Sequence, residues 1–299
     1  MHIAVLGCGF MGTALIEGLL RNANSPRDDE MTFTACVRSQ ASVDRLRQKF
    51  AQRPGMVQVV QGEVAKAAAR ADVVMLGCQP QELADLIRSQ DHAGENGDGL
   101  VGALKHKLVI SLLAGVSCQQ LLDALLDASA PATAGSTDQS RPFDIARVNP
   151  TMAASIGSSL TLLAEHRTPF ASHDRQQLVR DIFSRCGSVQ SVSEPLMDAA
   201  IAEGSTCHAL VFTAVDAATD ASVSMGLPRS AAVLIAAQCL QGASSLLVHG
   251  MTPESMKDSM SVPSGITINA ALRLERGQVR SGISDAVRHA IEYTRNMPT

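Results

Sequence analysis

Three glycines near the start of the sequence have the spacing of a phosphate-binding turn. Gly7, Gly9 and Gly12 follow an apolar run and precede an amphipathic pattern, which predicts a strand, a tight turn and a helix. We expect Gly7 to turn the chain, Gly9 to leave room for a pyrophosphate, and Gly12 to let the helix pack on the strand. The phosphates would lie at the helix N-terminus, where unpaired N–H groups and the dipole favour negative charge. The pattern therefore predicts a dinucleotide site that includes Phe10 and Met11.

The end of the second predicted strand, residues 31–37, indicates which dinucleotide is bound. In a sheet of this type an acidic residue at that end would bind the 2′-hydroxyl of NAD. No acidic residue follows this strand. Arg38 and Ser39 follow it instead, and they offer a cation and a hydroxyl that suit the 2′-phosphate of NADP. We therefore expect NADPH as the cofactor, with NADH as the alternative.

Two further apolar segments would position the rest of this site. Residues 72–76 and 108–113 are short and uninterrupted, as parallel strands buried on both faces should be. Because ligands in open α/β sheets lie beyond the carboxyl ends of the strands, the residues after these segments should border the cofactor. These residues are Cys78, Gln79, Pro80, Ala114 and Gly115.

The pattern up to residue 193 continues to alternate strands with helices. Further strands are predicted at 57–60, 145–148, 159–164 and 189–192, and helices at 42–51 and 172–185. Two segments rich in small and polar residues, 91–99 and 127–142, are predicted as surface loops, the second of them a mobile insertion. The alternation predicts an α/β fold with a Rossmann-type doubly wound sheet in residues 1–193.

Strand signals end at residue 194 and helical patterns follow. The predicted helices are 195–225, 228–249, 253–260, 265–276 and 279–296, with Pro228 and Pro253 in first turns and Thr252 as a cap. The first two helices are apolar nearly all round, and so small a domain cannot bury them alone. We therefore expect residues 194–299 to form an all-α dimerisation domain, and the chain to form a homodimer or a higher homo-oligomer.

Composition argues against several classes of protein. The 299 residues carry a formal net charge of −4, no long basic run, 3% aromatic residues and no Trp, so we expect no nucleic-acid partner. The seven cysteines have neither C-x-x-C nor zinc spacing, so we expect buried thiols in a reducing compartment and no metal site. With no targeting segment and no uninterrupted apolar run of membrane-spanning length, a cytoplasmic location without a membrane partner is expected.

Segments in both predicted domains resemble the pyrroline-5-carboxylate reductase family. They are the G-x-G-x-M-G turn, the A-D-V-V strand with Pro80-Gln81, the S-L-L-A-G-V run from Ser111, Met197-Asp198-Ala199, M-G-L-P-R at 225–229, Lys257-Asp258, and P-S-G-I-T-I at 263–268. The last segment is similar to the family's S-P-G-G-T-T signature. The resemblance implies NADPH-dependent reduction of the cyclic imine 1-pyrroline-5-carboxylate to L-proline, or of a closely related cyclic imine, by hydride transfer to the imine carbon.

The resemblance also implies roles for residues of the signature segment. Thr267 corresponds to the family threonine that donates a hydrogen bond to the ring nitrogen, which makes it the expected catalytic residue. The backbone amides around Ile266 and Thr267, together with Ser264 and Gly265, would hold the substrate carboxylate at a helix start.

Other matches and differences surround the expected substrate pocket. Ser259 stands where the family has a substrate-contacting asparagine, and Glu194 matches a family glutamate near the bound imino acid. The run S-T-C-H-A-L at 205–210 replaces G-S-G-P-A-Y, which places His208 beside the expected site as a candidate proton donor. Gln79 replaces a family lysine, and N-P-T-M-A at 149–153 replaces M-P-N-T-P.

Two other functions remain alternatives. A 3-hydroxy-acid-type dehydrogenase needs a lysine on the interdomain helix for proton transfer, and no lysine lies between Lys107 and Lys257. A non-catalytic, nucleotide-sensing paralogue is favoured by the altered pocket residues. Oxidation of NADPH by any cyclic imine would exclude the sensing role.

Overall fold

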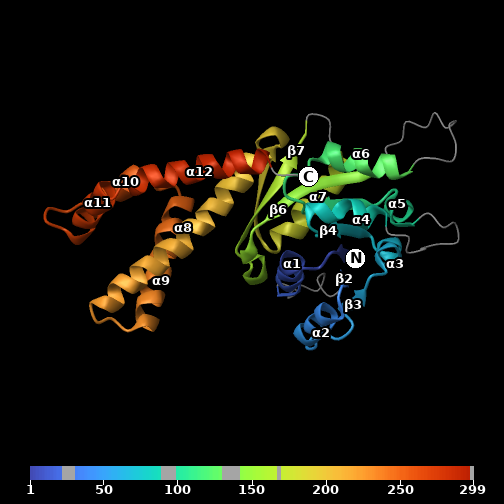
Figure 1. Ribbon diagram of the computed structural model, residues 1–299, viewed down its shortest axis with the longest axis horizontal. Coiled ribbons are helices and arrows are strands. Elements are labelled where there is room, and N and C mark those ends of the chain that lie inside the picture. The colour runs from blue at the N-terminus through green and yellow to red at the C-terminus, as the bar shows by residue number, and fades with distance from the viewer. Residues whose placement is uncertain (22–30, 89–98, 130–141, 167–169, 297–299) are drawn as a thin grey trace. The chain divides into compact units, whose positions relative to one another are not determined.

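The alternating segments of the first part of the chain form one mixed β-sheet (Figure 1). The computed structural model describes residues 1–21, 31–88, 99–129, 142–166 and 170–296. Within them the sheet has eight strands in the order β3-β2-β1-β4-β5-β6-β7-β8. The strands are β1 His2–Leu6, β2 Thr32–Val37, β3 Val57–Gln61, β4 Val73–Leu76, β5 Leu108–Ser111, β6 Asp144–Pro150, β7 Ser159–Glu165 and β8 Gly187–Ser193.

Strand pairing follows the hydrophobic pattern. The pairs from β3 through to β6 are parallel, and β4 and β5 are buried along their whole length, as their uninterrupted apolar runs predict. The pair β6 and β7 is antiparallel, whereas β7 and β8 are parallel. The sheet is therefore mixed at the edge that β7 and β8 form.

Helices cover both faces of this sheet. They are α1 Phe10–Arg21, α2 Gln40–Lys49, α3 Val64–Arg70, α4 Leu83–Arg88, α5 Gly99–Leu104, α6 Cys118–Ser129 and α7 His173–Ser184, with short 3₁₀ helices η1 Pro80–Glu82, η2 Met152–Ile156 and η3 Glu194–Leu196. Ile3 and Val5 of β1 belong to the same core as α1, α2 and α7, whereas Ala4 and Leu6 belong to the core beneath α3 to α6. Successive strand residues thus point to opposite cores, and the predicted doubly wound fold is confirmed.

The structure also corrects parts of the predicted pattern. Short helices α4 and α5 form where no helix was predicted. Residues 127–129 were predicted as loop but complete α6, and Gly99, predicted as the end of the other loop, begins α5. Residues 91–98 and 130–141 of the two predicted loops lie outside the described residues, and Pro142 is described.

The rest of the chain is helical. Its elements are α8 Met197–Ser224, α9 Arg229–Val248, α10 Pro253–Met260, α11 Ile266–Arg276 and α12 Val279–Arg295. Thr252 caps α10 as predicted, because its side-chain oxygen accepts a hydrogen bond from the Ser255 N–H at 3.2 Å, with Pro253 in the first turn. Pro228, predicted inside the first turn of α9, is instead the residue before it.

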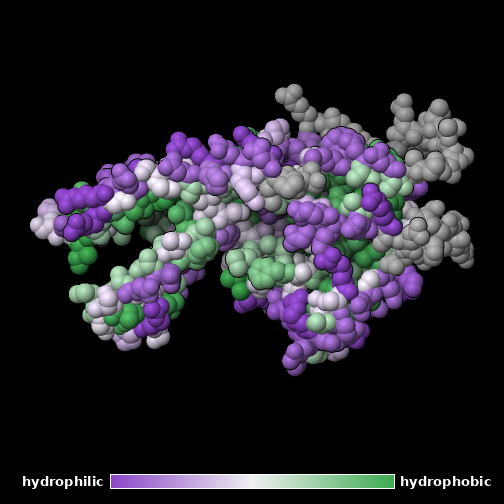
Figure 2. All heavy atoms as spheres, in the orientation of Figure 1, coloured by the Kyte–Doolittle hydropathy of each residue, from purple (hydrophilic) through white to green (hydrophobic). Residues whose placement is uncertain are grey.

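The structure divides into two units, which we call the sheet unit, Met1–Ile201, and the helical unit, Ala202–Asn296. In the helical unit, the buried residues among those described are Ala202, Thr206, Thr219 and Ala232. Hydrophobic side chains lie at its surface along α8 and α9 (Figure 2).

One helix has an unexpected property. Among the described residues, α9 has the length and apolar composition of a membrane-spanning helix, and 6% of its apolar window is buried. Gln238 and Gln241 interrupt the apolar run within this helix, which is why no uninterrupted apolar run of that length was expected. Cys207 and Cys239 are exposed in the helical unit, so the expectation that the cysteines are buried is wrong for these two.

Candidate functional site

The three glycines after β1 each meet a different environment. Gly7 has φ +81°, and a Cβ there would lie 2.6 Å from the backbone nitrogen of Cys78, so only glycine fits this turn. A Cβ at Gly12 would lie 2.9 Å from Cγ1 of Val5, which keeps α1 close to β1. A Cβ at Gly9 would meet nothing within 4 Å, so the backbone there stays open to a ligand. These environments match the packing roles predicted for the three residues.

A cavity of about 280 Å³ lies beside this turn. It is lined by Gly7, Cys8, Gly9, Val37, Arg38, Ser39, Ser42, Gly77, Cys78, Gln79 and Glu82. A second cavity of about 210 Å³ shares Gly7, Arg38 and Cys78 with the first and adds apolar side chains that include Val64 and Leu86. The turn, the end of β2 and the end of β4 thus border one concave region, as expected for a ligand site beyond the carboxyl ends of the strands.

An acidic residue faces Arg38. Nη2 of Arg38 lies 2.5 Å from Oε1 of Glu82. Glu82 also lines the cavity, and its Oε2 accepts a hydrogen bond from the Gln79 N–H at 3.2 Å. No acidic residue directly follows β2, but η1 brings a carboxylate that is remote from β2 in sequence to the same end of the sheet. The Arg38 side chain is 81% exposed, so it can reorient toward a ligand.

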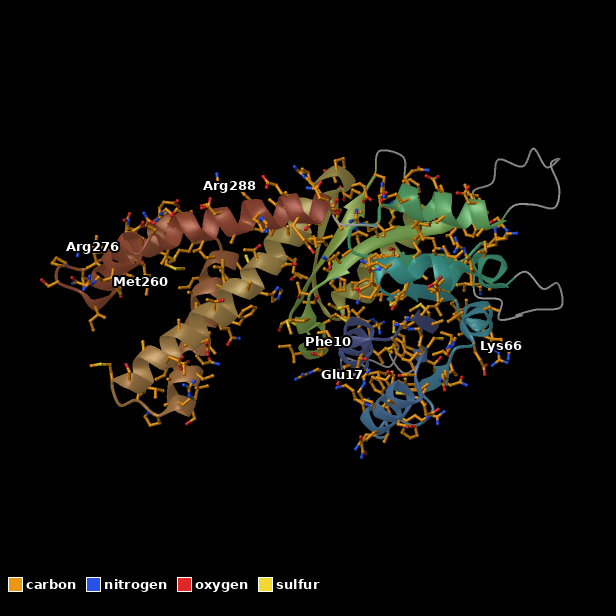
Figure 3. The ribbon with its side chains drawn as sticks, viewed as in Figure 1. Phe10, Glu17, Lys66, Met260, Arg276 and Arg288 are labelled. Carbon is orange, nitrogen blue, oxygen red and sulfur yellow. The ribbon has the colours of Figure 1, made fainter. Side chains whose placement is uncertain are left out.

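Other residues predicted to bind the cofactor lie at the starts of helices or outside the two cavities. Ser39 is the N-cap of α2, and its side-chain oxygen accepts a hydrogen bond from the Ser42 N–H at 3.3 Å. Phe10 begins α1 and is 68% exposed (Figure 3), and Met11 beside it is half-buried. Pro80 begins η1. The two residues Ala114 and Gly115 follow β5 but do not line either of these cavities.

The signature segment lies at the start of α11 in the helical unit. Gly265 is the N-cap, and a Cβ there would lie 2.7 Å from Cγ2 of Val262, so glycine is required for this tight entry. Ser264 before it has φ +60°, a left-handed conformation that is costly for a residue with a side chain. Ile266 is 91% exposed and Thr267 is also exposed. The helix has no side-chain cap, so its first amide N–H groups are available to an anion.

Two further predicted residues hold local hydrogen bonds in the helical unit. Nδ1 of His208 on α8 lies 2.7 Å from the carbonyl oxygen of Gly204. Because a carbonyl only accepts, Nδ1 of His208 donates the hydrogen in this contact. Ser259 on α10 donates a hydrogen bond to the carbonyl of Met256 at 2.9 Å.

Glu194 lies in the sheet unit, in a buried polar cluster that the sequence did not predict. Arg147 on β6, 3% exposed, donates to Oε1 of Glu194 at 3.1 Å and to Oδ1 of Asp198 at 2.7 Å. The N–H of Cys118 also donates to Oε1 of Glu194, at 3.2 Å, and Nε2 of His166 lies 3.7 Å from its Oε2. A charged residue inside an otherwise apolar strand was the signal for this cluster, since buried charges need partners.

Burial sets the protonation states within this cluster. It raises the pKa of the Cys118 thiol to about 12, and the nearby Glu194 carboxylate adds to the shift. Burial also lowers the pKa of His166, against the attraction of Glu194. The thiol and the imidazole are therefore both neutral at pH 7.

Comparisons with known proteins cover both units. Residues 194–297 match the family described as pyrroline-5-carboxylate reductase dimerisation, and residues 2–115 match the family described as NADP oxidoreductase, coenzyme F420-dependent. Pyrroline-5-carboxylate reductase of Lophium arboricola is 33% identical over 97% of this chain and 91% of its own length. The Schizosaccharomyces pombe protein of that name is 31% identical over 96% of this chain and 95% of its own.

Solved structures agree with this chain at the level of the fold. The crystal structure of Plasmodium falciparum pyrroline carboxylate reductase, with NADP bound, has a TM-score of 0.76 at 20% identity and covers 100% of this chain and 98% of its own. The same two-part architecture, a Rossmann-type sheet followed by helices, is therefore present in both proteins.

Proposed function

This chain belongs to the pyrroline-5-carboxylate reductase family, and we propose that it reduces 1-pyrroline-5-carboxylate, or a closely related cyclic imine, to the cyclic amino acid with NADPH. The observation that carries the proposal is the match to reductases of that name above 30% identity over nearly the whole of both chains. In this reaction the cofactor supplies a hydride to the imine carbon and a proton is added to the nitrogen, which gives L-proline from the named substrate.

The proposed cofactor site is the concave region beside Gly9 in the sheet unit. The open backbone at Gly9 and the N-terminus of α1 suit the pyrophosphate, and Arg38 with Ser39 suits the 2′-phosphate. For Arg38 to hold that phosphate, it must exchange its contact with Glu82 for one with the cofactor. The rim residues Cys78, Gln79, Pro80, Ala114 and Gly115 complete this proposal by their place after β4 and β5.

The proposed substrate residues belong to the helical unit. The first amides of α11, at Ile266 and Thr267, would bind the substrate carboxylate, and Ser264 and Gly265 shape their approach. The Thr267 hydroxyl would donate a hydrogen bond to the ring nitrogen, which becomes an amine as the hydride is added. His208 and Ser259 remain predicted contacts, as does Glu194 of the sheet unit.

We further propose that the working enzyme is a cytoplasmic homodimer or a higher homo-oligomer. The apolar surface of α8 and α9 and the match of residues 194–297 to a dimerisation family support a second copy, rather than a lipid bilayer, as the cover of α9.

The experiment follows NADPH oxidation with 1-pyrroline-5-carboxylate and a panel of other cyclic imines. Turnover with the named substrate is expected, and fastest turnover with another imine would redefine the substrate within the same reaction. A chain that binds NADPH but oxidises it with none of them would be a nucleotide-sensing protein, and the proposed activity would be wrong.

A further inference from the structure

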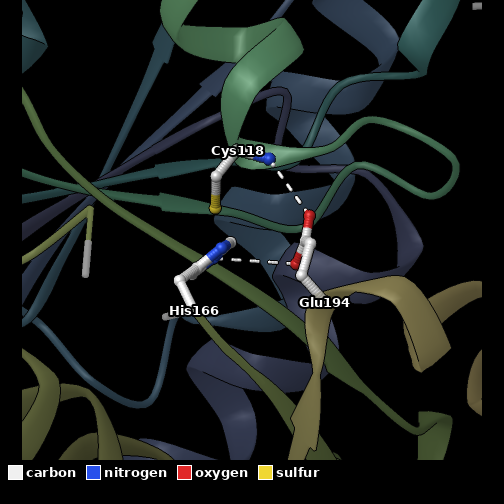
Figure 4. Close-up of side chains that lie close together, drawn as sticks. All are labelled: Cys118, His166 and Glu194. Carbon is white, nitrogen blue, oxygen red and sulfur yellow. Dashed lines mark hydrogen bonds and ion pairs between the residues drawn. The ribbon is translucent and has the colours of Figure 1, made fainter. Parts of the chain in front are cut away.

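Three metal-ligating side chains meet in the sheet unit, and one of them, Glu194, is also a predicted substrate contact. Cys118 is the first residue of α6, His166 directly follows β7, and Glu194 begins η3. One ligand atom of each lies within 4.8 Å of the others, and the three side chains point toward one another (Figure 4). Cys118 is buried, and the side chains of His166 and Glu194 are 12% and 17% exposed.

Two polar atoms of this group lack a hydrogen-bond partner among the described residues. They are Nε2 of His166 and Oε2 of Glu194, both buried, and their separation of 3.7 Å is too long for a hydrogen bond. Native proteins pair nearly all such atoms, because a buried and unpaired polar group is costly. An imidazole nitrogen, a carboxylate oxygen and a cysteine sulfur are the donor set that Zn²⁺ prefers.

The spacing suits a bound ion after a small contraction. When three atoms lie no more than 4.8 Å apart, a point exists within about 2.8 Å of all of them. Bonds from zinc to nitrogen, oxygen and sulfur are about 2.0–2.3 Å long, so each side chain needs to move by no more than about 0.5–0.8 Å. Three protein ligands leave a fourth tetrahedral position for water or another small ligand.

Among the residues that the structure describes, Arg147 is the cation that contacts these ligands, and the charges of the described groups balance with it included. Glu194 and Asp198 carry two negative charges against the one positive charge of Arg147, which leaves the cluster negative. A divalent cation that displaces the Cys118 proton adds one net positive charge and makes the cluster neutral. Because Arg147 and the Cys118 amide both hold Oε1 of Glu194, its Oε2 is the oxygen left to face His166.

We propose that Cys118, His166 and Glu194 form a binding site for a thiophilic divalent transition metal such as Zn²⁺, which fastens α6, β7 and η3 together. Glu194 is also a predicted substrate contact, but the test of the metal site follows metal binding and needs no turnover, so the two proposals can fail separately.

The first test uses Co²⁺ as a spectroscopic probe on the full chain, after removal of bound metals with a chelator. We expect one equivalent to bind per chain, with a thiolate-to-cobalt charge-transfer band, and Zn²⁺ to displace it. Cys118→Ser keeps the size of the side chain but should abolish the band, and His166→Ala should weaken binding by at least about 10-fold. Cys207→Ser and His173→Ala, which alter an exposed cysteine and an exposed histidine, should bind Co²⁺ as the unaltered chain does.

Absence of saturable Co²⁺ binding, or a band that persists in Cys118→Ser, would overturn the proposal. Thermal unfolding with and without Zn²⁺ provides a second measurement. Zn²⁺ should raise the melting temperature of the unaltered chain and of Cys207→Ser but not that of Cys118→Ser. Retained NADPH binding by Cys118→Ser shows that the variant is folded; if it does not fold, His166→Ala gives the same comparison.

Discussion

The sheet unit and the helical unit are both rich in apolar residues but bury them to opposite extents. In the sheet unit, strands such as β4 and β5 are inaccessible along their whole length, and two cores pack against the opposite faces of the sheet. In the helical unit Phe212, Leu234 and Ile235 are 67%, 62% and 53% exposed. Apolar area removed from water stabilises a fold by about 25 cal/mol per Å². The sheet unit gains this from its own chain, whereas the helical unit must gain it from a second surface.

The largest effect should come from a charge on the exposed face of α8. Phe212 lines a hollow of about 710 Å³ together with Val233 of α9. In a symmetric dimer Phe212→Asp buries one unpaired carboxylate in each copy, so we expect the dissociation constant of the dimer to rise by at least about 10³-fold. Sedimentation at low micromolar concentration should show a dimer or larger assembly for the unaltered chain and mainly dissociated subunits for Phe212→Asp.

The control for this prediction lies in the sheet unit. Leu126 on α6 is 42% exposed, and Leu126→Asp should leave the assembly unchanged. If Leu126→Asp dissociates the assembly equally, or if the unaltered chain is a well-folded monomer, the contrast between the two units does not arise from a dimer interface.

The second effect separates catalysis from cofactor binding. Thr267→Val keeps the shape of the side chain and removes the hydroxyl proposed to face the ring nitrogen, so kcat should fall by about 10²-fold. NADPH affinity should not change, because the proposed cofactor residues belong to the sheet unit. Thr294→Val, which removes a hydroxyl that donates to Ala290 on α12, serves as the matched control and should leave both quantities unchanged. Full activity in Thr267→Val would show that Thr267 has no catalytic role and is only a residue in the first turn of α11.

The third effect concerns the sheet unit alone. Arg38→Ala should weaken NADPH binding by about 10- to 100-fold, because a charge-assisted contact contributes about 1.5–3 kcal/mol, and should leave NADH binding nearly unchanged. Fluorescence titrations of both cofactors measure the difference, with Arg53→Ala as a control at an exposed arginine that does not line the cavity. Equal weakening of NADPH binding and NADH binding would show that Arg38 does not contact the 2′-phosphate.

The smallest effect tests the carboxylate that faces Arg38. The ion pair is partly exposed, and a surface ion pair contributes about 0–1 kcal/mol, so Glu82→Gln should tighten NADPH binding by no more than about 5-fold as it frees Arg38 and removes a repelling charge. NADH binding should change less. Glu63→Gln removes an exposed acid, paired with Lys66 at 3.7 Å, and should affect binding of neither cofactor. Weaker NADPH binding in Glu82→Gln would mean that the carboxylate positions Arg38 rather than competing for it.

Local sequence patterns predicted the helices and strands more accurately than they predicted how those helices and strands pair and pack. The spacing of Gly7, Gly9 and Gly12 predicted a strand, a turn and a helix, because the pattern is local and Gly7 takes a positive φ at the turn. The apolar runs predicted β4 and β5 because a strand buried on both faces is apolar at every position. The antiparallel pairing of β7 with β6 and the helices α4 and α5 were not predicted, since pairing direction and short helices depend on packing that local sequence does not encode.

By itself the sequence determined the α/β order, the apolar helices that need a partner, and the glycine turn after β1 with Arg38 at the end of β2. Only the tertiary structure placed Glu82 against Arg38 and gathered Cys118, His166 and Glu194 around one point. These residues are far apart in sequence, and no spacing rule connects them. Charges and ligands act through distances of a few ångströms in space, and those distances are set by which strands pair and which loops their ends support.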